Sequence, residues 1–64
     1  MAGGLAYIRK LYGVPARRGA RVEYDGQRGV ITGAINAHVR IRLDGETKSR
    51  IYHPTWKIKY LPEE

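Results

Sequence analysis

The sequence predicts a small all-β protein, a five-stranded barrel preceded by a short helix or arm. From residue 17 onward, apolar side chains recur at every second position in five short segments that are separated by turn-forming residues. Glycines at 26, 29 and 33 lie in and beside the second segment, as the sharply bent strands of a small barrel require. The 64 residues are enough for one domain. Since so short a chain buries only about 60% of its unfolded surface, the core needs nearly every large apolar residue.

The first element is expected at residues 4–12, "GLAYIRKLY". Apolar residues spaced by three and four form one helical stripe there: Leu5, Ile8 and Leu11 or Tyr12. Gly13 follows where a left-handed cap ends a helix, and Pro15 prevents its continuation. So short a helix must dock on another element to be stable. The alternative is an extended arm that is anchored by the same side chains.

The five expected strands each present one apolar face. Their alternating apolar positions are Val22 and Tyr24; Ile31; Val39, Ile41 and Leu43; Ile51 and His53; and Trp56, Ile58 and Tyr60. Asp25 and Gly26 form a favoured hairpin pair, and "HPTW" fits a tight turn or one turn of 3₁₀ helix. Trp56 and Tyr60 are therefore assigned to the core. The single domain 1–64 divides into a helix or arm (1–16), the barrel (17–62) and an acidic tail (63–64).

Two further glycines lie within the second strand. Gly29 and Gly33 flank Ile31 on its own face, where they relieve crowding as the sheet coils. The alternative is that they let a ligand approach the backbone. Bending is the better interpretation of the two.

The hairpin at residues 38–53 predicts a cationic face. If Asp44 pairs with Lys48 across a three-residue loop, Ile41 faces Ile51 and Val39 faces His53. This register stacks three arginines on the outer face with a tyrosine among them: Arg40, Arg42, Arg50 and Tyr52. A register shifted by one residue would place Arg50 on the core face, where an unpaired charge is costly.

Charge gives the strongest indication of function. Twelve Lys and Arg against six Asp and Glu give +6, and the chain without Glu63 and Glu64 carries twelve minus four, or +8. Such a surplus attracts polyanions, although a merely solvated basic surface is the alternative. The predicted nucleic-acid site places phosphates on the arginines and a base on the tyrosine of that outer face. Lys57 and Lys59 widen it, and Arg17, Arg18 and Arg21 form a second contact arm.

Several kinds of chemistry have no support in the residues. The chain contains no cysteine, and His38 and His53 are too few for a metal site, so no metal or cofactor is expected. His53 is expected to hydrogen-bond the turn that follows it. The single serine, Ser49, lies in a charged loop, and phosphate-binding glycine motifs are missing, so we do not expect an enzyme. The first residues contain no apolar run suited to a signal peptide or membrane span, which favours a cytoplasmic protein without membrane contact.

"GARVEYDGQRGVITGAINAHVRIRLDG", 27 of the 64 residues, resembles the KOW type of SH3-like barrel found in ribosomal proteins and transcription elongation factors. Gly29 matches the central glycine of that family, and Val22 and Ile31 match its apolar positions. The resemblance implies an SH3-like fold. Over nearly the whole chain, "YGVPARRGARVEYDGQRGVITG" and "HPTWKIKYL" are similar to small bacteriophage and prophage proteins. That likeness implies an accessory protein of a bacterial cytoplasm or a virion, and it brings no activity with it.

The expected function is a non-enzymatic module that binds nucleic acid with weak sequence specificity. The alternative is a protein-interaction or virion-assembly module that binds an acidic partner, because SH3-like barrels serve both purposes. A third interpretation is a virion component that self-associates through an exposed strand edge. The choice between DNA and RNA and the oligomeric state remain open.

Overall fold

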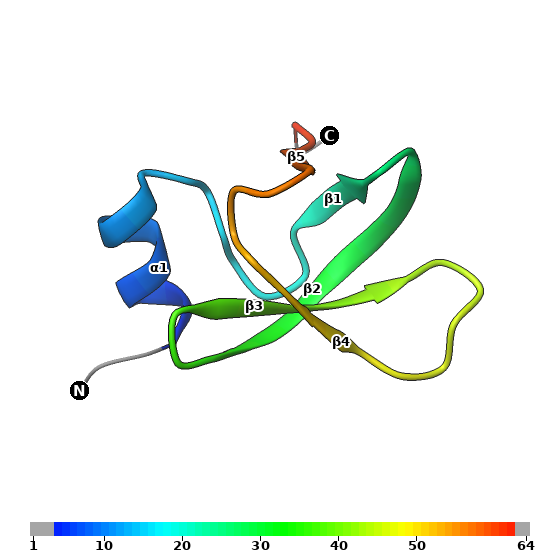
Figure 1. Ribbon diagram of the computed structural model, residues 1–64, viewed down its shortest axis with the longest axis horizontal. Coiled ribbons are helices and arrows are strands. Elements are labelled where there is room, and N and C mark those ends of the chain that lie inside the picture. The colour runs from blue at the N-terminus through cyan, green and yellow to red at the C-terminus, as the bar shows by residue number, and fades with distance from the viewer. Residues whose placement is uncertain (1–3, 63–64) are drawn as a thin grey trace.

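The computed structural model describes residues 4–62 and contains one helix and a five-stranded antiparallel sheet (Figure 1). The elements are α1 (Leu5–Tyr12), β1 (Arg21–Tyr24), β2 (Gln27–Ile35), β3 (His38–Leu43), β4 (Arg50–Tyr52) and β5 (Ile58–Tyr60). The strands lie in the order β4-β3-β2-β1-β5. The mostly-β prediction is confirmed. The predicted acidic tail at 63–64 and the first three residues of the predicted arm lie outside the described residues.

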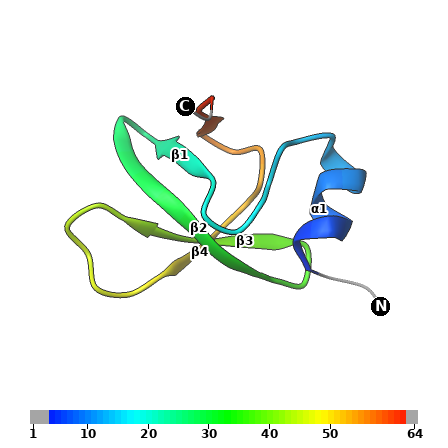
Figure 2. The same cartoon turned by 180° about the vertical axis from the view of Figure 1, so that it is seen from behind.

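The sheet is coiled but not closed, so the prediction of a closed barrel is not confirmed. The two edge strands, β4 and β5, are three residues long and have no ladder between them in the described part of the chain. Such short strands offer few backbone groups for a closing ladder. The long β2–β3 hairpin forms the centre of the sheet, and Figure 2 shows β2 running diagonally across the molecule below β1.

The predicted helix is present and docks on the sheet. Gly13 adopts the left-handed conformation (φ 67°), and its N–H donates to the carbonyl of Arg9 at 2.9 Å. Arg9 Nη1 also donates to the carbonyl of Ala16 at 2.8 Å, which ties the helix to the segment that follows it. Ile8 is fully buried, and both views place α1 beside one end of β3 (Figures 1 and 2). The helix therefore closes one end of the core.

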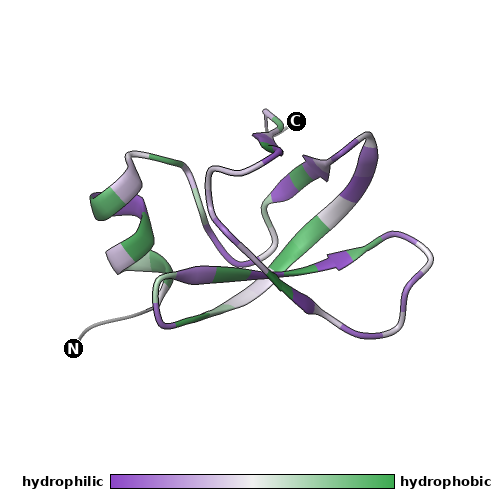
Figure 3. Cartoon of the chain, viewed as in Figure 1, coloured by the Kyte–Doolittle hydropathy of each residue, from purple (hydrophilic) through white to green (hydrophobic). Residues whose placement is uncertain are grey.

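The core lies on the inner face of the sheet and under α1. Its buried apolar residues are Ile8, Ala16, Val22, Ile31, Val39, Ile41 and Leu43. Along β3, exposed and buried residues alternate without exception, and Figure 3 shows the matching alternation of polar and apolar colour. Period-two patterning thus assigns the two faces of this strand correctly.

The two strand glycines have different roles. A Cβ at Gly29 would lie 2.9 Å from the carbonyl oxygen of Arg42, so only glycine fits this close approach. Gly33 lies where the β2–β3 register slips, and a Cβ there would meet no heavy atom within 4 Å. Crowding therefore explains Gly29 alone, because the bulge turns Gly33 away from the face of Ile31. The predicted Asp25–Gly26 turn is confirmed, with both residues at positive φ.

The predicted register of the hairpin at 38–53 is wrong by one residue. The structure pairs Val39 with Tyr52, Arg40 with Ile51 and Ile41 with Arg50. Six residues, 44–49, connect the strands in place of the predicted three-residue loop. Arg50 and Tyr52 consequently point to the inner side of the sheet, and Ile51 points to the outer side.

Two contacts fix the longer connection. Glu46 N–H donates to the carbonyl of Leu43 at 3.0 Å, and the hydroxyls of Thr32 and Ser49 lie 2.6 Å apart. This register does not bury the charge of Arg50, because its side chain remains 70% exposed on an edge strand. Its Nε lies 3.4 Å from Glu46 Oε1.

Trp56 is not a core residue, contrary to the prediction. It is 69% exposed and precedes β5, which begins at Ile58. Lys57 adopts φ 59°, and this positive value interrupts the extended backbone that the alternating pattern assumed. Tyr60 is half-buried, and its hydroxyl donates to the carbonyl of Pro54 at 2.8 Å.

Candidate nucleic-acid interface

The outer side of β3 forms the centre of a basic face. His38, Arg40 and Arg42 are exposed, whereas the residues between them belong to the core. Neither Arg40 nor Arg42 forms an ion pair with any residue in the range 4–62. Their guanidinium groups therefore remain free to bind an external anion.

The neighbouring strands extend this face. Strand pairing aligns Arg42 with Val30 and Val30 with Arg21, and it aligns Arg28 with Glu23 and Glu23 with Lys59. We define the outer basic face by its five exposed cations: Arg21, Arg28, Arg40, Arg42 and Lys59.

Two acidic residues border the outer basic face without neutralising it. Glu23 lies between Arg28 and Lys59 in the strand register. Asp44 Oδ2 lies 3.7 Å from Arg21 Nη2, and both side chains are more than half exposed. Exposed pairs of this kind contribute about 0–1 kcal/mol and hold their partners weakly. Five cations against two acids leave a surplus of three positive charges.

Aromatic rings continue the face beyond the end of β3. The rings of His38 and His53 lie 6.0 Å apart edge to face, as expected when the β3–β4 register is extended by one residue. His53 in turn stacks on Trp56, with ring centroids 4.4 Å apart and planes 15° apart. The arginines and the exposed indole are thus connected through two histidine rings.

His53 is held in place by its own turn and by the helix. Its Nδ1 accepts the backbone N–H of Thr55 at 3.1 Å, which confirms the predicted hydrogen bond to the turn. The ring of Tyr12 packs against it edge to face at 5.3 Å. These contacts hold the imidazole ring on which Trp56 stacks. One face of the indole is therefore covered by His53, while the side chain as a whole remains exposed.

Two exposed apolar side chains lie among these groups. Ile51 is 55% exposed and pairs with Arg40, and Ile35 is 41% exposed and pairs with His38. The outer side of the sheet therefore combines a cationic region with an aromatic and apolar end. We define the aromatic end by Ile35, His38, Ile51, His53 and Trp56.

Some predicted site residues lie on the outer basic face and others do not. Arg40, Arg42 and Lys59 lie there, and Arg21, predicted in a second arm, lies there too. Arg17 and Arg18 are exposed in the segment before β1, and Lys57 is exposed before β5. Five predicted site residues lie outside the outer basic face: Arg50, Tyr52, Arg17, Arg18 and Lys57.

Tyr52 cannot serve as the predicted stacking surface on the outer side. It pairs with Val39 and packs on Tyr24 with ring centroids 4.5 Å apart. Burial, and next the nearby carboxylate of Glu46, raise the pKa of its hydroxyl. Its environment is that of a core-edge residue.

Sequence reasoning assigned six residues of this surface to no site: Arg28, Ile35, His38, Ile51, His53 and Trp56. The alternation of Arg28 and Val30 with the inner residues Gly29 and Ile31 of β2 contained the signal for Arg28. The period-two pattern along β3 already turned His38 outward beside Arg40 and Arg42, although no site was assigned to it. Ile51 and His53 depended on the hairpin register and Trp56 on the start of β5, both of which short-range patterning placed incorrectly. Ile35 lies outward because of the bulge in β2.

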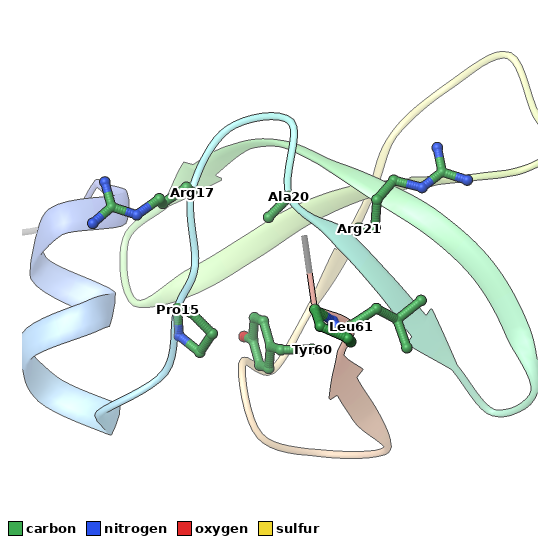
Figure 4. Close-up of a pocket in the computed structure, with 7 residues that line it drawn as sticks. Pro15, Arg17, Ala20, Arg21, Tyr60 and Leu61 are labelled. Atoms are coloured by element: carbon green, nitrogen blue, oxygen red, sulfur yellow. The ribbon is translucent and has the colours of Figure 1, made fainter. Parts of the chain in front are cut away.

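A surface hollow of about 350 Å³ lies between the segment before β1 and the end of β5. Figure 4 shows Pro15, Ala20 and Tyr60 lining it, with the guanidinium groups of Arg17 and Arg21 extending away on either side. Since ligand pockets contain converging polar groups, this hollow lacks the features of a specific binding site.

Two other kinds of site receive no support from the structure. Within residues 4–62, no three His, Cys, Asp or Glu side chains gather closely enough to hold a metal ion. No helix in this range is both long and apolar enough to cross a bilayer.

Comparison with known proteins gives no match to a family model, to a curated protein or to a solved structure.

Proposed function

We propose that this protein is a non-enzymatic module that binds nucleic acid through the outer basic face, with weak sequence specificity. The observation that carries the proposal is the convergence of five exposed cations from four strands. Arg40 and Arg42 lie at its centre and form no ion pair within residues 4–62. Phosphate contacts of this kind supply affinity and salt dependence but do not read sequence.

The proposed fold class is the SH3-like barrel. The order β4-β3-β2-β1-β5, in which a four-strand meander is followed by a short strand returning to β1, supports it. The KOW resemblance at 19–45 supports it independently. A bacterial cytoplasm or a virion is proposed as the location on the resemblance to phage and prophage proteins alone.

Salt dependence tests the function. Fluorescence anisotropy of a labelled oligonucleotide measures the association constant. We expect the logarithm of this constant to fall linearly with the logarithm of the salt concentration. If all five cations contact phosphates, the slope is about −3.5 for a single strand, from about −0.7 per contact. Binding that does not change with salt would reject the proposal.

A pair of charge-matched variants tests the location. Arg40→Ala combined with Arg42→Ala should weaken binding and reduce the slope by about 1.4. Lys10→Ala combined with Lys48→Ala removes the same charge from exposed positions in α1 and in the 44–49 loop. This control should change the affinity far less. Equal losses in the two double variants would mean that net charge alone accounts for binding.

One observation favours a second candidate, an interaction or assembly module for an acidic protein. Ile35, Ile51 and Trp56 are exposed apolar groups beside the cations, a combination that protein interfaces also use. The two candidate functions differ in the range of ligands that the protein would bind. A nucleic-acid binder accepts many sequences of equal length, whereas a protein binder requires one shape and shows no salt-dependent binding to oligonucleotides.

A further inference from the structure

We infer that the surface selects single-stranded nucleic acid, with one unpaired base stacking on the open face of Trp56. The inference rests on the proposed function, because it assumes that phosphates bind the outer basic face. Trp56 is the residue that would distinguish a single strand from a duplex.

The setting of Trp56 is that of a stacking surface. A 64-residue chain has few large apolar groups, yet its one tryptophan is 69% exposed. His53 covers one face of the indole at a centroid distance of 4.4 Å, and His53 is itself held by Thr55 and Tyr12. The indole is therefore preorganised, and its exposure leaves a flat aromatic surface for a base. Bases stack on such surfaces whatever their identity.

The cations are arranged in line with this surface. Arg42, Arg40 and His38 are successive outward residues of β3, which places them about 6.6 Å apart. The ring of His53 lies 6.0 Å beyond His38, and Trp56 follows. An extended strand along β3 can place its phosphates on the two arginines and then bring a base onto the indole. Ile51, which pairs with Arg40, adds an apolar contact for another base.

A duplex cannot use this arrangement fully. Its bases are paired and stacked inside the helix, so only its phosphates would contact the protein. The arginines should then bind both forms, whereas Trp56 contributes only to the binding of single strands.

The experiment compares one labelled single strand with its duplex at the same length and salt concentration. Fluorescence excited selectively at the indole, beyond the absorption band of the five tyrosines, reports on Trp56 alone, because it is the only tryptophan. We expect quenching by the single strand and little change with the duplex. Trp56→Leu should weaken single-strand binding about 5- to 150-fold, the effect of losing one stacked base, and leave duplex binding unchanged. Trp56→Phe should retain part of the affinity.

Tyr7→Leu is the matched control, because Tyr7 is a partly exposed aromatic residue of α1. It should leave both affinities unchanged. Circular dichroism melts establish that each variant is folded. Salt-dependent binding that is equal for both forms, or that survives Trp56→Leu, would overturn the inference and leave the proposed function intact. Failure of the unmodified protein to bind either form at low salt would overturn the proposed function itself.

Discussion

Replacing Gly29 with alanine tests whether the coiling of the sheet depends on a close backbone approach. An added Cβ would lie 2.9 Å from the carbonyl oxygen of Arg42, and 3.0 Å from side-chain carbons of both Ile41 and Leu43. The side-chain tips can rotate, but the carbonyl oxygen belongs to the central β2–β3 ladder. Relief of the clash therefore requires the two strands to move apart.

The expected cost is about 1–3 kcal/mol, the usual penalty for overpacking a core. A more restricted unfolded chain offsets about 0.4–1 kcal/mol of it. The free energy of unfolding of a 64-residue domain is about 3–10 kcal/mol, so Gly29→Ala removes a large fraction of it. With a urea dependence of about 1 kcal/mol per molar, the net loss of about 0.6–2 kcal/mol should lower the midpoint by about 0.6–2 M. Far-UV circular dichroism is the appropriate signal.

Gly33→Ala is the matched control on the same strand. Its φ is not positive, and an added Cβ meets no heavy atom within 4 Å. We expect its urea midpoint to stay the same or to rise slightly because the unfolded chain loses entropy. If the two alanine variants unfold at the same urea concentration, the steric explanation of Gly29 is wrong.

Two further predictions concern stability. Burial raises the pKa of the Tyr60 hydroxyl above its usual value of 10.0, so the unfolded chain releases this proton first. The contribution of this group to stability is therefore constant below about pH 10 and falls as pH rises above it. Tyr60→Phe should reduce the alkaline loss of stability and cost about 1–3 kcal/mol at neutral pH, because the carbonyl of buried Pro54 loses its donor. Unchanged urea midpoints at both pH values would contradict this. Ile8→Ala should cost about 2–5 kcal/mol, since Ile8 is fully buried, whereas exposed Leu11→Ala should change stability by less than about 0.5 kcal/mol. Thermal melts check this pair, and equal melting temperatures would mean that α1 does not stabilise the fold.

Local patterning predicted the parts of the fold that local forces determine. The strict alternation along β3 placed Arg40 and Arg42 outward, and the Asp25–Gly26 pair marked the first hairpin. The apolar stripe and Gly13 marked the helix and its end. In each of these elements, side-chain periodicity and turn chemistry agree with the tertiary structure.

The candidate site depended on contacts that are distant in sequence. The Thr32–Ser49 hydrogen bond and the six-residue connection set the β3–β4 register, and nothing within the hairpin itself indicates them. The observed register differs from the predicted one by one residue. Because successive side chains of a strand point to opposite faces, this difference places Ile51 on the outer side, where Arg50 and Tyr52 were expected. Arg50 is tolerated on the inner side because β4 is an edge strand, where a long side chain reaches water.

The most direct test of binding at the outer basic face follows the arginine Nε–Hε signals of the unmodified protein by NMR during titration with a single-stranded oligonucleotide. Arg40 and Arg42 lie on the outer basic face, whereas Arg50 points to the other side of the sheet and contacts Glu46. If the outer basic face and Trp56 bind one strand together, the signals of Arg40, Arg42 and the Trp56 indole N–H shift together and saturate at one ratio of oligonucleotide to protein, with the Arg50 signal nearly unchanged. A shift of Arg50 as large as that of Arg42, or no shift in any of these signals, would show that the strand does not bind there.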